Sequence, residues 1–326
     1  MKSRHDYAEL LRNQYKNRIE VLETFNSTSP DISASIDAQR VGNVVLSRLQ
    51  TNFGYVAHNP EISTFEETLC FTFLEEGGAV AAQNGQIEQL SKDNVLIYSN
   101  IRNANWQFQT AFSEFVIQIP MSVVARQFPA AEKLIGRTYP RSANTQTLLQ
   151  FLKSYLSLSS PQNCSEQTRR TVSTMFESLL LLEVDSFCKS HDLHVDVDAQ
   201  KEALGFRIRS FILSHLDDYE LTAEKIARAN HISVRTLYDV FSLQGIPVME
   251  FLWKARLNQA RKELTDFRLA NVSVSEIAFR CGFKSPSHFS KRFRQAFGAT
   301  PMELRAASLA APSQSPFVGS PSADCL

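Results

Sequence analysis

The sequence has few of the patterns that mark membrane, secreted, metal-dependent or catalytic proteins. No apolar run approaches the roughly 20 residues that a membrane-spanning helix needs. The five cysteines have no Cys-x-x-Cys pair, which disfavours a disulfide framework or a zinc cluster and is typical of a reducing cytoplasm. The charged first residues do not predict a secretory signal. No Gly-x-Ser-x-Gly motif, phosphate loop or dinucleotide fingerprint is present, so we expect no enzymatic activity.

Length and composition indicate a folded protein of about two domains. The chain has 326 residues, at roughly 100–200 residues per domain. With 43 % hydrophobic and 21 % charged residues, a disordered or fibrous chain is excluded. The net charge of zero hides an asymmetry: residues 1–200 hold 17 Lys and Arg against 22 Asp and Glu, and residues 201–326 hold 17 against 12. The positive C-terminal part favours an anionic partner.

The N-terminal part predicts a polar, irregular arm, then strands, then helices. Between residues 40 and 120, short apolar or alternating runs are separated by turn signals, as in a small barrel or sandwich. The clearest hairpin is centred on Asn84-Gly85, because both residues tolerate positive φ. Beyond Pro120, apolar residues recur every three or four positions, most clearly over 166–188, and predict helices.

An internal repeat is the most informative feature of the C-terminal part. LTAEKIARANHISVRTLYDVF (221–241) matches VSVSEIAFRCGFKSPSHFSKRF (272–293) at an offset of 51–52 residues. Each copy predicts a short helix, a tight turn and a second helix with inward apolar anchors, which is a helix-turn-helix. The predicted N-cap residues are Thr222, Ser233, Ser273 and Ser285.

A long amphipathic helix over 248–266 is predicted to join the two motifs. If both second helices enter one face of a DNA duplex, they should meet successive major grooves about 34 Å apart. A plain helical hairpin is the alternative for either copy alone, and the repetition argues against it.

At these residues the sequence resembles the AraC/XylS family of bacterial transcription regulators. The resemblance covers residues 203–306 and is specific at SVSEIAFRCGFKSPSHFSKRFRQAFGATPMELR. The first motif departs from it at Asn230-His231, where the family often has a glycine. More loosely, the N-terminal part is similar to the family's effector-binding and dimerisation domain, a cupin-like β-barrel with a helical appendage.

The resemblance implies an α+β protein with an all-α C-terminal domain. Its expected parts are an arm (1–35), an effector-binding and dimerisation domain (36–190), a linker (191–202), an AraC-type DNA-binding domain (203–306) and a disordered tail (307–326). The implied function is that of a cytoplasmic transcriptional activator controlled by a small organic effector. Its implied partners are double-stranded DNA, RNA polymerase and a second copy of the chain, with no membrane. The alternatives are an effector-independent regulator and a cupin-type enzyme fused to a DNA-binding module.

DNA contacts are expected on the outward face of the second helix of each motif. The family's base-reading positions map onto Arg235, Tyr238 and Asp239; arginine can bind guanine and aspartate can accept from cytosine N4. The full base-reading set is Arg235, Thr236, Tyr238, Asp239, Pro286, Ser287, His288 and Lys291. The phosphate set is Ser233, Lys284, Ser285, Arg292 and Arg294. A solvated helix face is the alternative for each residue.

Aromatic residues on predicted strands are the candidates for an effector pocket, with core packing as the favoured alternative. They are Tyr55, Phe71, Phe73, Trp106 and Phe108. By alternation, Trp106 and Phe108 share one face. His58, beside Asn59-Pro60, is expected to be a turn residue. Since it is the one histidine of the barrel region, no metal and no other cofactor are expected.

Overall fold

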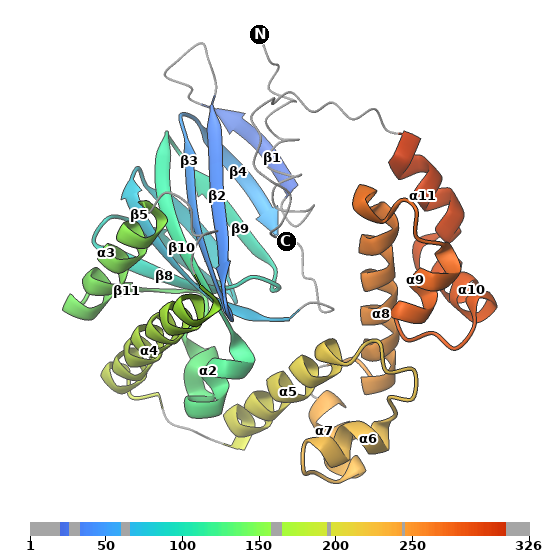
Figure 1. Ribbon diagram of the computed structural model, residues 1–326. Coiled ribbons are helices and arrows are strands. Elements are labelled where there is room, and N and C mark those ends of the chain that lie inside the picture. Colours follow the sequence, from blue (N-terminus) through green and yellow to red (C-terminus); the bar gives the residue numbers. More distant parts are fainter. Residues whose placement is uncertain are drawn as a thin grey trace. The chain divides into compact units, whose positions relative to one another are not determined.

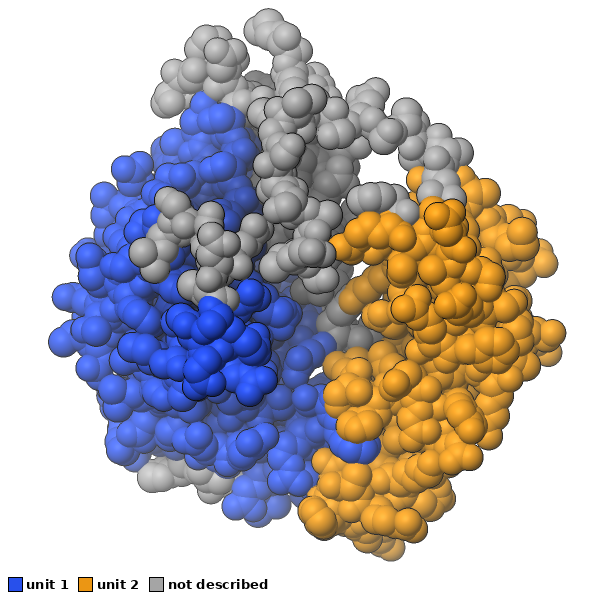
Figure 2. All heavy atoms as spheres, in the orientation of Figure 1, with its two compact units in different colours: residues 1–211, 238–245 blue, residues 212–237, 246–326 orange. Residues whose placement is uncertain are grey.

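The structure is a computed structural model that describes residues 20–25, 33–59, 66–157, 165–193, 197–242 and 245–310. The chain forms two compact units, 1–211 with 238–245 and 212–237 with 246–326 (Figure 2). No helix among the described residues combines the length and apolar character needed to cross a membrane.

The first unit is built on two antiparallel β-sheets (Figure 1). One sheet has the strand order β11-β8-β5-β10-β3-β2, and the other has the order β1-β4-β9-β6-β7. The strands are β1 (Glu20–Phe25), β2 (Ala34–Val41), β3 (Val44–Thr51), β4 (Gly54–Asn59), β5 (Thr68–Glu76), β6 (Ala79–Gln83), β7 (Gln86–Leu90), β8 (Asn94–Ser99), β9 (Ala104–Phe108), β10 (Phe112–Pro120) and β11 (Arg137–Pro140).

These sheets do not close into the expected barrel. Closure needs a continuous ladder of hydrogen bonds around the ring of strands. Within the described residues, β7 lies beside β8 and β11 but pairs with neither. The sheets share an apolar layer that includes Leu49 and Leu74 from one sheet and Trp106 and Phe108 from the other. The arrangement is that of two facing sheets, the sandwich alternative of the sequence analysis.

The hairpin prediction at Asn84-Gly85 is confirmed. β6 and β7 pair in register from Ala79 with Leu90 to Gln83 with Gln86. The turn residues have φ angles of 57° and 74°, so both adopt the left-handed conformation that a two-residue type I′ hairpin requires.

The expected irregular arm contains regular structure. Residues Glu20–Phe25 form β1, which pairs with β4 at the edge of its sheet, and Ala34 begins β2. The other residues of 1–33, apart from Ser33, lie outside the described part of the chain. Polar residues are tolerated on edge strands, so polarity alone did not reveal this strand.

Helices cover the outer face of the six-stranded sheet. They are α2 (Met121–Gln127), the 3-10 helix η1 (Pro129–Leu134), α3 (Ala143–Ser157), α4 (Glu166–Ser190) and α5 (Val197–Ser214). Their apolar residues form one core with Phe71, Phe73, Phe115 and Ile117 of the sheet. Helix α5 begins inside the expected linker 191–202, and the division between the units falls after Phe211.

The C-terminal part is entirely helical. Its elements are α6 (Ala223–Ala229), α7 (Val234–Ser242), α8 (Val248–Thr265), η3 (Phe267–Leu269), α9 (Val274–Arg280), α10 (Pro286–Phe297) and α11 (Pro301–Ala310). The long helix α8 contacts α9, α10 and α11. Phe289 and Phe293 of α10 pack with Leu257, Ala260 and Leu264 of α8 in one core. Of the expected tail 307–326, residues 307–310 continue α11 and the rest lie outside the described residues.

Candidate nucleic-acid interface and ligand pocket

The helix pairs α6–α7 and α9–α10 begin with the same capping contacts. In the first pair, the side chains of Thr222 and Ser233 accept hydrogen bonds from the backbone N–H of Lys225 (3.4 Å) and Thr236 (3.0 Å). In the second pair, Ser273 and Ser285 accept from Glu276 (3.1 Å) and His288 (3.2 Å). All four helices therefore begin where the N-cap residues of the repeat predict.

The turn inside each pair also has one geometry. The N–H of Ile232 donates to the carbonyl of Ala227, and the N–H of Phe283 donates to the carbonyl of Ala278, both over 3.0 Å. The residues just before these donors, His231 and Gly282, have φ angles of 57° and 76°. A left-handed residue followed by a hydrogen bond back to the helix is the Schellman helix end.

The second helix of each pair buries one face and exposes the other. Leu237 and Phe241 of α7 and Phe289 and Phe293 of α10 are buried. Four-residue spacing places each pair on one side of its helix, which leaves the polar side for solvent. The copies differ in charge: residues 221–242 hold three Lys and Arg against two acidic residues, while residues 272–297 hold five against one.

Arg256 of α8 ties the start of the C-terminal unit to the turn of the second motif. It is 1 % exposed and donates from Nε to the carbonyl of Leu216 (3.0 Å) and from Nη2 to that of Asp218 (2.6 Å). A Cβ on Gly282 would overlap the Leu216 oxygen and lie 2.8 Å from Arg256 Nε. The left-handed turn and its close packing both require glycine at this position.

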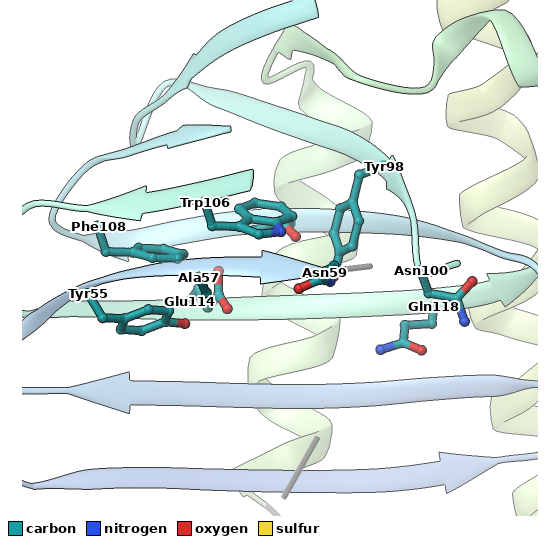
Figure 3. A pocket seen from close by; sticks show the side chains of 10 residues that line it. Tyr55, Ala57, Asn59, Tyr98, Asn100, Trp106, Phe108, Glu114 and Gln118 are labelled. Atoms are coloured by element: carbon teal, nitrogen blue, oxygen red, sulfur yellow. The ribbon is translucent and has the colours of Figure 1, made fainter. Parts of the chain in front are cut away.

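A pocket of about 70 Å³ lies between the two sheets of the first unit (Figure 3). Within it, the small Ala57 on β4 pairs with the large Trp106 on β9. The lining residues are Tyr55, Ala57, Asn59, Thr72, Tyr98, Asn100, Trp106, Phe108, Glu114 and Gln118.

Three of the five residues predicted for an effector pocket line it, namely Tyr55, Trp106 and Phe108. The placement of Phe71 and Phe73 was wrong, because both side chains lie in the core under the helices. Successive strand residues point to opposite faces, so it is Thr72 that reaches the pocket.

The sequence analysis missed the most unusual lining residue, Glu114 of β10. Its side chain is only 5 % exposed, and no described hydrogen bond or ion pair involves its carboxylate. Burial raises the pKa of Glu114 to about 8. The missed signal is a single acidic residue, two positions before Val116, in a mostly apolar strand.

His58 is a strand residue rather than a turn residue. It lies in β4, and its Nδ1 is 2.8 Å from the side-chain oxygen of Asn105 on the paired strand β9. The described residues contain no group of three His, Cys, Asp or Glu side chains placed to hold a metal ion.

A polar network joins the rim of the pocket to α5. The Asn100 side chain accepts from the N–H of Thr68 (2.8 Å) and donates to the carbonyl of Glu66 (3.4 Å). The carboxylate of Glu66 accepts from Ser210 of α5 (2.9 Å), and that of Glu67 lies 3.6 Å from Arg209 of α5.

Glu67 is itself the centre of this network. It is buried and accepts from Ser99 Oγ and from Arg102 Nε, both at 2.7 Å, while Arg102 also pairs with Glu132 at 2.7 Å. A buried carboxylate held by this many donors fixes the geometry around it, since any broken contact leaves a charge without compensation.

Comparison with known proteins identifies the C-terminal repeat. A helix-turn-helix domain family matches residues 226–307. Residues 226–307 are thus an AraC-type helix-turn-helix domain. The transcriptional activator NphR of Rhodococcus sp. is 38 % identical over 95 residues, which cover 29 % of this chain and 28 % of NphR. The activator RhaS of Klebsiella pneumoniae (strain 342) is 37 % identical over 98 residues, 29 % of this chain and 34 % of RhaS.

The matches with these two activators thus extend over about a third of their length or less. Both are named as transcriptional activators, and neither is named as an enzyme. Among solved structures, the crystal structure of the AraC-like transcriptional activator CuxR is similar with a TM-score of 0.49 and 14 % identity, covering 77 % of this chain and 90 % of that chain.

In the AraC-type domain, most of the residues predicted to read bases are accessible. The exposed ones are Arg235, Tyr238, Asp239, Ser287, His288 and Lys291, whereas Thr236 and Pro286 are half-buried. The Thr236 hydroxyl is 2.8 Å from that of Ser233, which places it in the cap of α7. The expected DNA contacts of all eight residues remain predictions.

The residues predicted to contact phosphates are less uniform. Lys284, Arg294 and Ser233 are exposed, and Ser285 is half-buried in its capping role. Arg292 is half-buried over the ring of Trp253, 4.7 Å from its centroid, and donates to His288 Nε2 at 3.0 Å. In this AraC-type domain, Arg292 therefore supports the start of α10 in addition to any phosphate contact.

Proposed function

We propose that this chain is a DNA-binding transcriptional activator whose AraC-type domain binds double-stranded DNA through α7 and α10. The observation that carries the proposal is the matched geometry of the two helix pairs. Both have the same caps and the same left-handed turn, and each second helix has an exposed polar face. Two such helices on one domain suit two successive major grooves. The names of NphR and RhaS support activation as the outcome.

Base reading and phosphate binding are assigned to different side chains of these helices. Arg235 and Lys291 are proposed to donate to guanine, Asp239 to accept from cytosine N4, and Ser287 to serve either base type. Lys284 and Arg294, with the caps Ser233 and Ser285 and the half-buried Arg292, are proposed to hold phosphates and fix the register on the duplex.

The N-terminal unit is proposed to bind a small organic effector in the pocket between its sheets. A ligand changes activity only if it binds one conformation better than another. The route we propose runs from Asn100 through Glu66 and Glu67 to Arg209 and Ser210 on α5. Helix α5 then continues into the unit that carries the AraC-type domain.

We further propose that the active form is a homodimer that contacts RNA polymerase at the promoter. On α4, Met175 and Leu182 are 46 % and 48 % exposed and lie seven residues apart, so they share one side of the helix. Exposed apolar residues in this pattern suit a helix of a second copy.

The DNA-binding proposal can be tested with the full chain. Duplexes that bind the protein are selected from a random pool, and affinity for the selected site is measured against salt. Binding should fall steeply as salt rises, because phosphate contacts release counterions. The double variant Arg235→Ala/Lys291→Ala should lose the selected site, whereas the control Arg126→Ala, an exposed arginine on α2, should bind normally. Failure to select any site, or a flat salt response, would reject the proposal.

A separate experiment distinguishes effector control from effector-independent regulation. Thermal shifts of the full chain with small acids, amines and nitriles find a ligand, and DNA affinity is then measured with and without it. Arg209→Gln should leave ligand affinity within twofold of wild type and reduce the response of DNA affinity. DNA affinity that no bound ligand changes would favour effector-independent regulation.

A further inference from the structure

Three polar groups at the pocket have no hydrogen-bond partner among the described residues. The Glu114 carboxylate has no hydrogen bond or ion pair among the described residues. The hydroxyl oxygen of Thr72 and the amide oxygen of Asn59 are buried without a hydrogen-bond partner. Buried polar groups in folded proteins are nearly always satisfied, so three such groups around one pocket indicate that a polar ligand supplies the missing partner.

The walls beside these acceptors are aromatic. The rings of Trp106 and Tyr98 meet edge to face at 4.9 Å, Trp106 and Phe108 are nearly parallel at 6.2 Å, and Phe108 lies 4.9 Å from Tyr55. The four rings thus form a continuous row along the pocket (Figure 3). Aromatic faces attract cations, most strongly in a site shielded from water.

The charge of the pocket argues against an anionic ligand. No lysine, arginine or histidine occurs among the described side chains that line it. An anion would meet the negative faces of the rings, and the Glu114 carboxylate whenever it is ionised, with no positive side chain to neutralise it.

We propose that the pocket binds the ammonium head group of a small organic cation, with Glu114 as counter-ion and the aromatic row as its cage. This inference rests on the proposed function, because it names the chemical class of the effector. A primary amine could also donate to Thr72 and Asn59, whereas a quaternary ammonium uses the carboxylate and the rings alone. The limited space favours a compact head group.

Binding of such a cation should be linked to the ionisation of Glu114. Because the pKa of Glu114 is raised to about 8, its carboxyl is mostly protonated at pH 7 in the empty pocket. Only the ionised carboxylate can pair with the cation. Affinity should rise about tenfold per pH unit below pH 8 and level off above it. The titratable groups that face Glu114 across the pocket are Tyr55 on β4 and Tyr98 on β8, while β5 and β9 contribute no titratable lining residue.

The test compares choline with 3,3-dimethylbutan-1-ol, a neutral molecule of the same shape, by calorimetric titration of the full chain. Choline should bind at least tenfold more tightly than the neutral analogue. Near pH 7 its binding should also displace the proton of Glu114, which is detected because the measured binding enthalpy then changes with the ionisation enthalpy of the buffer. Glu114→Gln should lower choline affinity at least tenfold and leave the neutral analogue unchanged. The matched control Glu166→Gln, an exposed glutamate on α4, should bind both as wild type does. Ala57→Val, which fills the pocket, should weaken both ligands.

Three results would overturn the inference: no choline binding at millimolar concentration, equal affinity for the neutral analogue, or unchanged choline affinity in Glu114→Gln. Because Glu114→Gln removes a buried unpaired carboxyl, we expect it to fold, and its unfolding temperature checks this. If choline binds as expected but does not change the affinity for DNA, the cation site is supported and the proposal of effector control is rejected. If DNA binding persists without any cation binding, the inference fails and the DNA-binding function stands.

Discussion

The two helix-turn-helix copies reach the same left-handed turn with different residues. Gly282 packs directly against the Leu216 carbonyl and the Arg256 side chain, so the second turn has no room for a side chain. His231 takes the equivalent conformation in the first copy with its side chain exposed to solvent. The comparison shows that the turn conformation is common to the motif, while the need for glycine comes from what packs against it.

Gly282→Ala should have the largest effect on this comparison. The added methyl group would adopt an unfavourable φ and overlap backbone, so we expect a loss of about 2–4 kcal/mol in the stability of the C-terminal unit. The chain has two tryptophans, Trp106 in the first unit and Trp253 in the second. In a Trp106→Phe background, urea unfolding followed by Trp253 fluorescence reports the second unit. A loss below 1 kcal/mol would show that the close packing at Gly282 is not a constraint.

Arg235→Ala tests whether the first copy reads bases. A bidentate contact to guanine predicts a cost of about 1–3 kcal/mol on the selected site and a relaxed preference at one base pair. Lys291→Ala is the corresponding change in the second copy. Binding measured on the selected duplex and on its single-base variants separates base reading from phosphate contact. An equal loss on every sequence would make Arg235 a phosphate contact.

Arg294→Gln tests whether the more basic second copy carries more of the phosphate binding. Removal of one phosphate contact should reduce the slope of log affinity against log salt by about 0.9. The control is Arg228→Gln, an exposed arginine of α6 in the less basic first copy. Similar slopes for Arg294→Gln and wild type would place Arg294 outside the DNA contact.

His231→Gly should have the smallest effect and the opposite sign. Glycine adopts the left-handed backbone conformation of residue 231 without the strain that histidine has there. The change should therefore stabilise the C-terminal unit by about 0.5–1 kcal/mol, after the higher flexibility of glycine in the unfolded chain is included. The same single-tryptophan unfolding experiment measures it. Destabilisation would indicate that the imidazole makes a contact that the turn needs.

The helix-turn-helix copies could be predicted because their determinants are local. Caps such as Ser273 and Ser285 lie within three residues of the groups they bind, and the apolar anchors recur at helical spacing. The burial of Arg256 could not be predicted this way. An arginine in an amphipathic helix usually faces solvent, and the carbonyls that Arg256 binds lie about 40 residues away in the chain.

The pocket was only partly predictable, because the six-stranded sheet is covered on both faces. In β9, alternating burial makes the inner face of Trp106 and Phe108 evident. In β5, six consecutive residues are buried, so the pattern does not show that Phe71 and Phe73 face the helices while Thr72 faces the pocket. The role of Glu114 depends on which face of β10 is enclosed by the other sheet, and the sequence does not specify this.

Two arginines bind the stretch of chain that runs from the end of α5 to Asp218. Arg209 is held by Glu67 on the side of the sheets, and the carbonyls of Leu216 and Asp218 are held by Arg256 on the side of the helix pairs. Breaking either contact would leave a charged side chain without its partner, which is unfavourable away from water. Each of these contacts lies within one unit. Removing the charge of Arg209 should therefore loosen this segment only where it packs on the first unit, and removing that of Arg256 only where it packs in the second.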